Sequence, residues 1–149
     1  MDKKILTKTL LTSLSTYDQF LTAFEKNITH RAQFSFVNYF DTYNQTQKIC
    51  DLIDDYSTLH DIRERINTVL SRASAKDEKI LRLYYCDCLS VNQIAKKFNI
   101  SGRTVFRYLS HALDWFIERI DEVIDCTNAG LLLDNNAWLK NIYRRIAND

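Results

Sequence analysis

Apolar residues recur every three or four positions along most of the chain, and this spacing predicts amphipathic helices. The first such stripe covers residues 5–28, with a break near residues 13–16 left open. A second and longer stripe extends from about Thr46 to Ser71. Between them, residues 31–47 also contain aromatic residues that would fit an alternating strand: Phe34, Phe36 and Phe40. Helix is favoured there, because the rest of the chain offers no partner strand.

The second stripe follows a heptad seam from Ile49 to Leu70, with Arg63 at a position where an apolar residue is expected. Three heptads with a charge in the seam are too few to predict a coiled coil. The sequence therefore leaves two arrangements open. The helix at residues 46–71 either packs within the monomer or pairs two protomers. The aromatic segment at residues 31–47 is expected to form core or an oligomer interface rather than a ligand pocket.

A polar joint at residues 71–75 precedes a new helix. Ser74 with Asp77 three residues later has the form of an N-cap followed by an acid in the first turn. The apolar residues that follow predict a helix from there to about Cys86. After Gly130 a last helical pattern begins, and Asp134 or Asn135 is expected to cap its final part.

Two short helices joined by a tight turn are predicted between Ser90 and His111. Ser90 is expected to cap the first helix, and Ser101 the second. Between them, Asn99 is expected to adopt the left-handed backbone conformation that many such turns give to glycine. This is the outline of a helix-turn-helix, whose second helix reads the major groove of DNA.

The second helix of this pair presents side chains that suit DNA. Its apolar positions Val105, Tyr108 and Leu109 are expected to face the core. Arginine can donate two hydrogen bonds to guanine, hydroxyls can bond bases or phosphates, and a phenyl ring can contact a thymine methyl. The residues predicted to bind DNA are Ser101, Gly102, Arg103, Thr104, Phe106, Arg107, Ser110 and His111, together with Lys96 and Lys97 of the preceding helix.

Local charge agrees with this placement, although the whole chain carries a formal charge of only +1. No acidic residue occurs between Asp87 and Asp114, and that interval holds four basic residues. Five acids then follow between Asp114 and Asp125, on what the pattern predicts to be a continuing helix. One end of the domain should therefore attract DNA and the other should not.

Composition narrows the class of protein. The 149 residues include no proline and only two glycines, which is typical of an all-α protein. The four cysteines lack zinc-ligand spacing, and the three histidines are scattered along the chain. We therefore expect no metal site and no cofactor, and we do not expect the protein to be an enzyme. No apolar run is long enough for a membrane span, and the N-terminus lacks the form of a signal peptide, so a cytoplasmic location is predicted.

The stretch KILRLYYCDCLSVNQIAKKFNISGRTVFRYLSHAL, residues 79–113, resembles region four of bacterial sigma factors. It is more similar to small phage-encoded, sigma-region-four-like regulators of late genes, of the autolysin-regulator and integrase-regulator type. The resemblance extends over about residues 50–118. It implies promoter DNA as the ligand, with contacts from Ser101, Arg103, Thr104 and Arg107. Residues 1–70 contain no segment that resembles the promoter-melting region two, so a complete sigma factor is not implied.

These observations predict a sequence-specific DNA-binding transcription regulator with three parts. Residues 1–72 form a helical region for homodimerisation or partner binding, residues 73–126 the helix-turn-helix domain, and residues 127–149 a C-terminal helix. Double-stranded DNA is the expected partner, with RNA polymerase as a further candidate. The alternatives are a phage DNA-packaging protein like a terminase small subunit, an architectural DNA-binding protein, and a divergent sigma factor or polymerase-binding helical protein.

Overall fold

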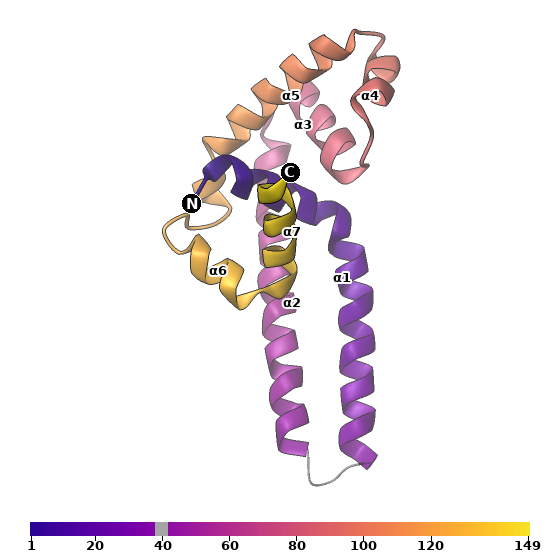
Figure 1. The fold of residues 1–149 in the computed structure, drawn as a ribbon, viewed down its shortest axis with the longest axis vertical. Helices are drawn as coiled ribbons and strands as arrows, with labels where there is room; N and C mark the ends of the chain where they lie inside the picture. The colour runs from indigo at the N-terminus through magenta and orange to yellow at the C-terminus, as the bar shows by residue number, and fades with distance from the viewer. Residues whose placement is uncertain (38–41) are drawn as a thin grey trace. The chain divides into compact units, whose positions relative to one another are not determined.

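The structure is a computed structural model that describes residues 1–37 and 42–149, with the side chains of 34–37 and 42 left out of the description. These residues form helices and turns without any strand, so the all-α prediction is confirmed. Figure 1 shows the helices α1 (Lys3–Val37), α2 (Thr42–Ser71), α3 (Ala75–Leu81), α4 (Val91–Phe98), α5 (Gly102–Ile117), α6 (Ala129–Asn135) and α7 (Ala137–Asn148). A π-helical turn, η2 (Arg82–Cys86), extends α3, and a 3-10 turn, η3 (Ile120–Glu122), follows α5.

Contacts between residues divide the chain into two compact units. The first unit contains residues 1–15 and 62–149, and the second contains residues 16–61. Both long helices therefore contribute to both units. These borders differ from the predicted joints near residues 72 and 126, and the functional division at those joints remains a prediction.

The second unit is an antiparallel pair of helices formed by the later part of α1 and the earlier part of α2. Phe24 stacks on Tyr56 with 4.8 Å between ring centroids, and the Tyr17 hydroxyl lies 3.2 Å from Nδ1 of His60. α2 thus pairs within its own chain here, while homodimerisation through residues 1–70 remains a prediction. The backbone is helical up to Val37 and again from Thr42, and the side chains of Phe34, Phe36 and Phe40 lie outside the described residues.

The first unit has a core to which every part of it contributes. Fully buried side chains come from the start of α1, the end of α2, α3, α4, α5, η3 and α7: Leu6, Leu10, Leu11, Ile66, Leu70, Ile80, Leu81, Ile94, Phe116, Ile120 and Leu139. Polar contacts add to it, since Lys3 forms an ion pair with Asp121 at 3.0 Å and the Arg65 guanidinium donates to the carbonyl of Val123. Residues 1–15 are thereby an integral part of this unit.

The helix α1 continues without interruption through residues 13–16, where the sequence alone allowed either a break or a continuous helix. The hydroxyls of Ser13 and Ser15 donate to the carbonyls of Leu10 and Thr12, three residues earlier. Hydroxyls that return to the backbone in this way are satisfied without ending the helix. The border between the two units nevertheless falls directly after Ser15.

Two details of the C-terminal part differ from the predictions. α5 ends at Ile117, so the acids from Glu118 to Asp125 lie on a turn and a 3-10 segment rather than on a continuing helix. The N-cap of α7 is Asn136 and not Asp134 or Asn135, because the Asn136 side chain accepts from the amide of Leu139.

Within residues 1–37 and 42–149, none of the helices is both long enough and apolar enough to cross a bilayer.

Candidate nucleic-acid interface

The helix α4 is capped at both ends by its own sequence. The Ser90 hydroxyl accepts from the amide of Gln93 at 3.2 Å, and the Gln93 side chain accepts from the amide of Ser90 at 2.9 Å, which completes a capping box. At the other end, Asn99 has φ 54° and ψ 48°. The predicted cap and the predicted left-handed turn residue are both confirmed, and the chain reverses here without glycine.

Ser101 caps α5 in the same manner. Its hydroxyl accepts from the amide of Thr104 at 3.2 Å and lies 2.9 Å from the Thr104 hydroxyl. α5 then contacts both α3 and α4, as Figure 1 shows. Val105 and Leu109 are buried against them, as expected, and Tyr108 is half-buried. The sequence therefore forms the two helices of the motif, and the bracing helix behind them, where they were predicted.

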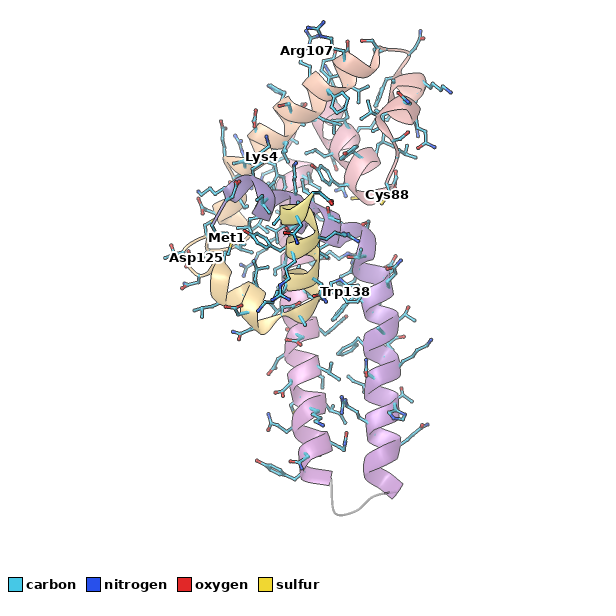
Figure 2. All side chains as sticks on the ribbon, viewed as in Figure 1. Met1, Lys4, Cys88, Arg107, Asp125 and Trp138 are labelled. Carbon is cyan, nitrogen blue, oxygen red and sulfur yellow. The ribbon has the colours of Figure 1, made fainter. Side chains whose placement is uncertain are left out.

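The outward face of α5 carries most of the predicted DNA-binding residues. Phe106 is 63% exposed, and its phenyl ring lies on the same helix face as the predicted DNA-binding arginines. Its exposed companions on α5 are Arg103, Arg107, Ser110 and His111, while Gly102 and Thr104 are half-buried in the first turn. Arg107 projects from the end of the domain in Figure 2. Lys96 and Lys97 are exposed in the last turn of α4, and Ser101 is exposed at its cap position.

A groove beside α5 contains one basic residue that the sequence did not reveal. Its volume is about 380 Å³, and it is lined by Ser74, Lys76, Asp77, Arg107, Tyr108 and His111. Lys76, at the start of α3, places its ammonium 3.1 Å from the centre of the Tyr108 ring. The arginine predicted to read DNA and a lysine 31 positions earlier thus line the same groove. No local sequence pattern links two residues so far apart.

Charge in this groove acts on Tyr108. A hydrogen bond from Lys76 and its positive charge lower the pKa of the Tyr108 hydroxyl below its ordinary value, and Arg107 adds to the effect. The groove also holds one carboxylate, Asp77, which is largely buried and lies 3.6 Å from Nδ1 of His111. Since that acid lies at the base of α3 and is not exposed, the accessible charge of the groove is positive.

Nothing in this region resembles a metal centre. Within residues 1–37 and 42–149, histidine, cysteine, aspartate and glutamate form no cluster of three or more that would hold an ion. The groups that remain are cations, hydroxyls, an exposed phenyl ring and the amide groups of the α5 N-terminus. This combination suits a polyanion that also presents apolar edges, as the grooves of DNA do.

Comparison with known protein families agrees with this geometry. Residues 63–115 match the family described as Sigma-70, region 4. The match contains the end of α2, the bracing helix and the complete helix-turn-helix, and it confirms the predicted sigma-region-four-like character of this part. The matched part is similar to a DNA-binding domain that acts in transcription. Among curated proteins and among solved structures, no significant match was found.

Proposed function

We propose that this protein is a sequence-specific, DNA-binding transcription regulator that reads the major groove with α5. The observation that carries the proposal is the single exposed face on which Arg103, Phe106 and Arg107 lie, in a region free of acids from Cys88 to Leu113. A solvated helix face needs no exposed phenyl ring, whereas a helix in the groove uses one against thymine methyls. The match to Sigma-70, region 4 supports the same reading.

The residues divide into two roles in this proposal. Arg103 and Arg107 read base edges, since a guanidinium can donate two parallel hydrogen bonds to guanine. Lys96, Lys97 and Lys76 contact phosphates, which fixes the position of the domain without carrying sequence information. The free amide groups at the start of α5 add a further phosphate contact next to Ser101.

The class of regulator and its partner are also part of the proposal. The resemblance of residues 79–113 to phage-encoded late-gene regulators supports a phage-type regulator that works on promoter DNA in the cytoplasm. The match to Sigma-70, region 4 supports RNA polymerase as a second partner. Because the site offers binding groups and no arrangement of nucleophile and base, we propose that it binds DNA without a catalytic step.

Selection of bound sequences from a random DNA pool, followed by affinity measurement with variants, tests this function. Arg103→Ala and Arg107→Ala should each weaken the selected site by about 1–3 kcal/mol, roughly tenfold or more, and relax the preference at one base pair. Arg145→Ala is the matched control, because Arg145 is exposed on α7 and belongs to no part of the reading face. Equal affinities for all four proteins would contradict the role of α5.

Two other measurements separate the alternatives. A ring of many subunits in solution would favour DNA packaging over regulation. Co-purification with RNA polymerase, together with no mobility shift on any DNA fragment, would favour a polymerase-binding protein that does not touch DNA.

A further inference from the structure

A second hollow lies in the first unit, on the side of the helix-turn-helix away from Arg107. It has a volume of about 410 Å³ and is lined by parts of α1, of the segment from η2 to α4, and of α7. Figure 2 shows Cys88, which lines this hollow, at the opposite end of the helix-turn-helix from Arg107. A volume of several hundred Å³ is within the range of small-molecule sites. A ligand there would leave the DNA-reading face open.

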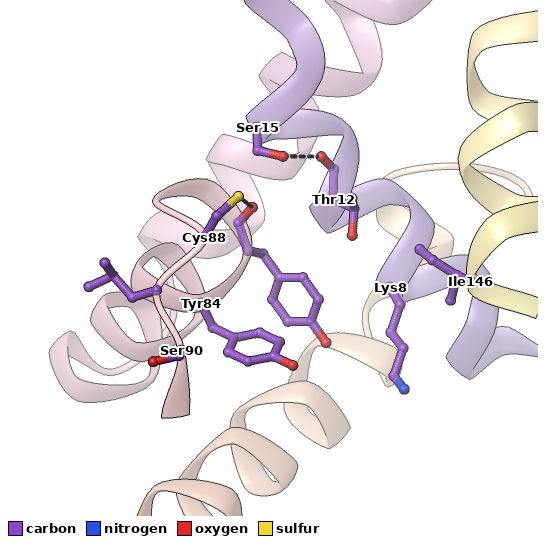
Figure 3. Close-up of a pocket in the computed structure, with 9 residues that line it drawn as sticks. Lys8, Thr12, Ser15, Tyr84, Cys88, Ser90 and Ile146 are labelled. Carbon is purple, nitrogen blue, oxygen red and sulfur yellow. Dashed lines mark hydrogen bonds between the residues drawn. The ribbon is translucent and has the colours of Figure 1, made fainter. Parts of the chain in front are cut away.

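Three of the polar groups that line this hollow are donors whose side chains have no hydrogen-bond or ion-pair partner among the described residues. Lys8 reaches it from α1, and Tyr84 and Tyr85 reach it from η2. Within the described part of the chain, Lys8 forms no ion pair and neither tyrosine hydroxyl forms a hydrogen bond. Figure 3 shows the Tyr84 ring and the Lys8 side chain extending into the same space from different walls.

The positive charge and the protonated hydroxyl groups of the lining residues favour binding of an anionic ligand. Burial raises the pKa of Tyr85 to about 12, so this hydroxyl keeps its proton and remains a donor at neutral pH. Lys8 is the charged group of the lining, and the residues that line the hollow include no acid. A ligand that accepts hydrogen bonds and carries negative charge would satisfy all three donors.

The remaining walls are apolar. Leu89 and Ile146 line the hollow together with the edges of the two tyrosine rings, which lie 4.9 Å apart in an edge-to-face arrangement. An inorganic anion would leave this surface in contact with water. The lining therefore fits an anionic head attached to an apolar body.

We infer that this hollow binds a small organic anion, a carboxylate or a phosphate monoester with an aromatic or aliphatic body. The anionic head bonds Lys8 and the tyrosine hydroxyls, and the body lies against Leu89 and Ile146. Lys8 and Ile146 lie outside residues 63–115, so the site combines the region similar to Sigma-70, region 4 with segments outside the matched residues.

A ligand bound at this site would act on the helix-turn-helix through the connection between η2 and α4, which includes Cys88 and Ser90. Ser90, the cap of α4, lines the hollow and holds the amide of Gln93. The connecting residue Cys88 has a positive φ of 54°, a backbone conformation that costs about 1–2 kcal/mol in an L-residue. A ligand packed against this strained connection stabilises the start of α4, so the site acts as an effector site for the reading pair.

The test uses the full chain with three probes: benzoate, its uncharged analogue benzamide, and inorganic phosphate. Calorimetry at millimolar concentrations detects ligands with dissociation constants near ~1 mM. Benzoate should bind at least about tenfold more tightly than benzamide or phosphate, because it alone supplies charge and an apolar body. Lys8→Gln should remove that advantage, whereas Lys4→Gln, which changes an exposed lysine of the same helix, should keep it.

Thiol chemistry and amide exchange provide readouts that do not involve DNA. Benzoate should slow alkylation of Cys88, which lines the hollow, without changing that of the exposed Cys50 in the second unit. It should also slow hydrogen exchange at the amide of Gln93. Tyr85→Phe, which keeps the ring and removes one donor, should weaken benzoate binding. The inference would be overturned if benzoate did not bind or if benzamide bound equally well. It would also be overturned if the two lysine variants had equal effects or if benzoate left Cys88 unprotected. Each of these outcomes is independent of the result for DNA binding.

Discussion

Asn99 decides how the chain turns between α4 and α5, and its contribution to stability can be predicted in sign and in size. Its backbone lies in the left-handed region, with φ 54° and ψ 48°, and its side chain is exposed. An L-residue loses about 1–2 kcal/mol in that region, whereas glycine loses nothing and asparagine is tolerated better than most residues. The Asn99 side chain forms no hydrogen bond within the described residues, so its removal exposes the backbone effect alone.

We expect Asn99→Ala to lower the free energy of unfolding of the first unit by about 1 kcal/mol. Asn99→Gly should leave it within about 0.5 kcal/mol, because relief of the left-handed conformation is offset by the backbone entropy that glycine loses on folding. Asn92 is the matched control, since it is exposed and lies within α4 in helical conformation. There, glycine should be less stable than alanine by about 0.5–1 kcal/mol, so the order of the two variants reverses between the sites.

Urea unfolding followed by tryptophan fluorescence measures this difference. Both tryptophans, Trp115 and Trp138, belong to the first unit, so the signal reports the unit that contains the turn even if the second unit unfolds separately. A shift in the transition midpoint at constant slope gives the change in stability. If Asn99→Ala were as stable as Asn99→Gly, the left-handed turn would not be what reverses the chain.

Further predictions concern the caps, the groove and the assembly. Ser90→Ala and Ser101→Ala should each lower the free energy of unfolding by about 1 kcal/mol, measured by the same urea unfolding, and no loss would show that the caps are dispensable. Lys76→Gln should raise the pKa of Tyr108 back toward its ordinary value of 10.0, because the lysine favours the phenolate. An NMR titration, with Tyr108→Phe as the assignment control, measures the pKa of Tyr108 in both proteins. An unchanged pKa would show that Lys76 does not act on the Tyr108 hydroxyl. If residues 1–70 pair two protomers, sedimentation velocity should show a dimer at micromolar concentration, and a monomer would refute that prediction.

The helix-turn-helix could be predicted from sequence because its signals are local. Ser90 and Gln93 lie three residues apart and satisfy each other, and Asn99 needs only its own side chain to tolerate the left-handed conformation. The exposure of Phe106 and the burial of Val105 follow from helical periodicity within one element. Each of these features depends on residues within a turn or two of one another, so the pattern of residue types contains the information.

The features that the sequence did not reveal depend on contacts between distant residues. Lys76 reaches Tyr108 only because α3 packs on α5. Lys8 lines the hollow beside Tyr84 only because residues 1–15 of α1 belong to the first unit. The π-helical form of η2 and the positive φ of Cys88 likewise have no composition signal, since neither glycine nor proline occurs there. The cap of α7 was missed by one or two positions, because Asp134, Asn135 and Asn136 are all suitable cap residues in sequence.

Charge provides the last and most quantitative prediction, because the net value of +1 conceals two opposite units. Residues 16–61 carry three basic and seven acidic side chains, while residues 1–15 and 62–149 carry 17 basic and 12 acidic ones. At about 0.1 M salt, charges more than about 10 Å from the DNA are largely screened, so binding should follow the local cations and not the total. If Lys76, Lys96 and Lys97 each contact one phosphate, the logarithm of the binding constant should fall linearly with the logarithm of the salt concentration, with a slope of about −2.7.

Replacement of Lys96, Lys97 or Lys76 by glutamine should reduce that slope by about 1 for every DNA sequence alike, because phosphate contacts carry no sequence information. Affinity measured across a salt series, with Lys4→Gln as a control for the loss of one remote charge, gives the slope for each protein. A slope near zero would contradict contact with the DNA backbone altogether. A slope much steeper than about −3 would show that basic residues other than these three lysines also contact phosphates, and the footprint would then have to include further elements.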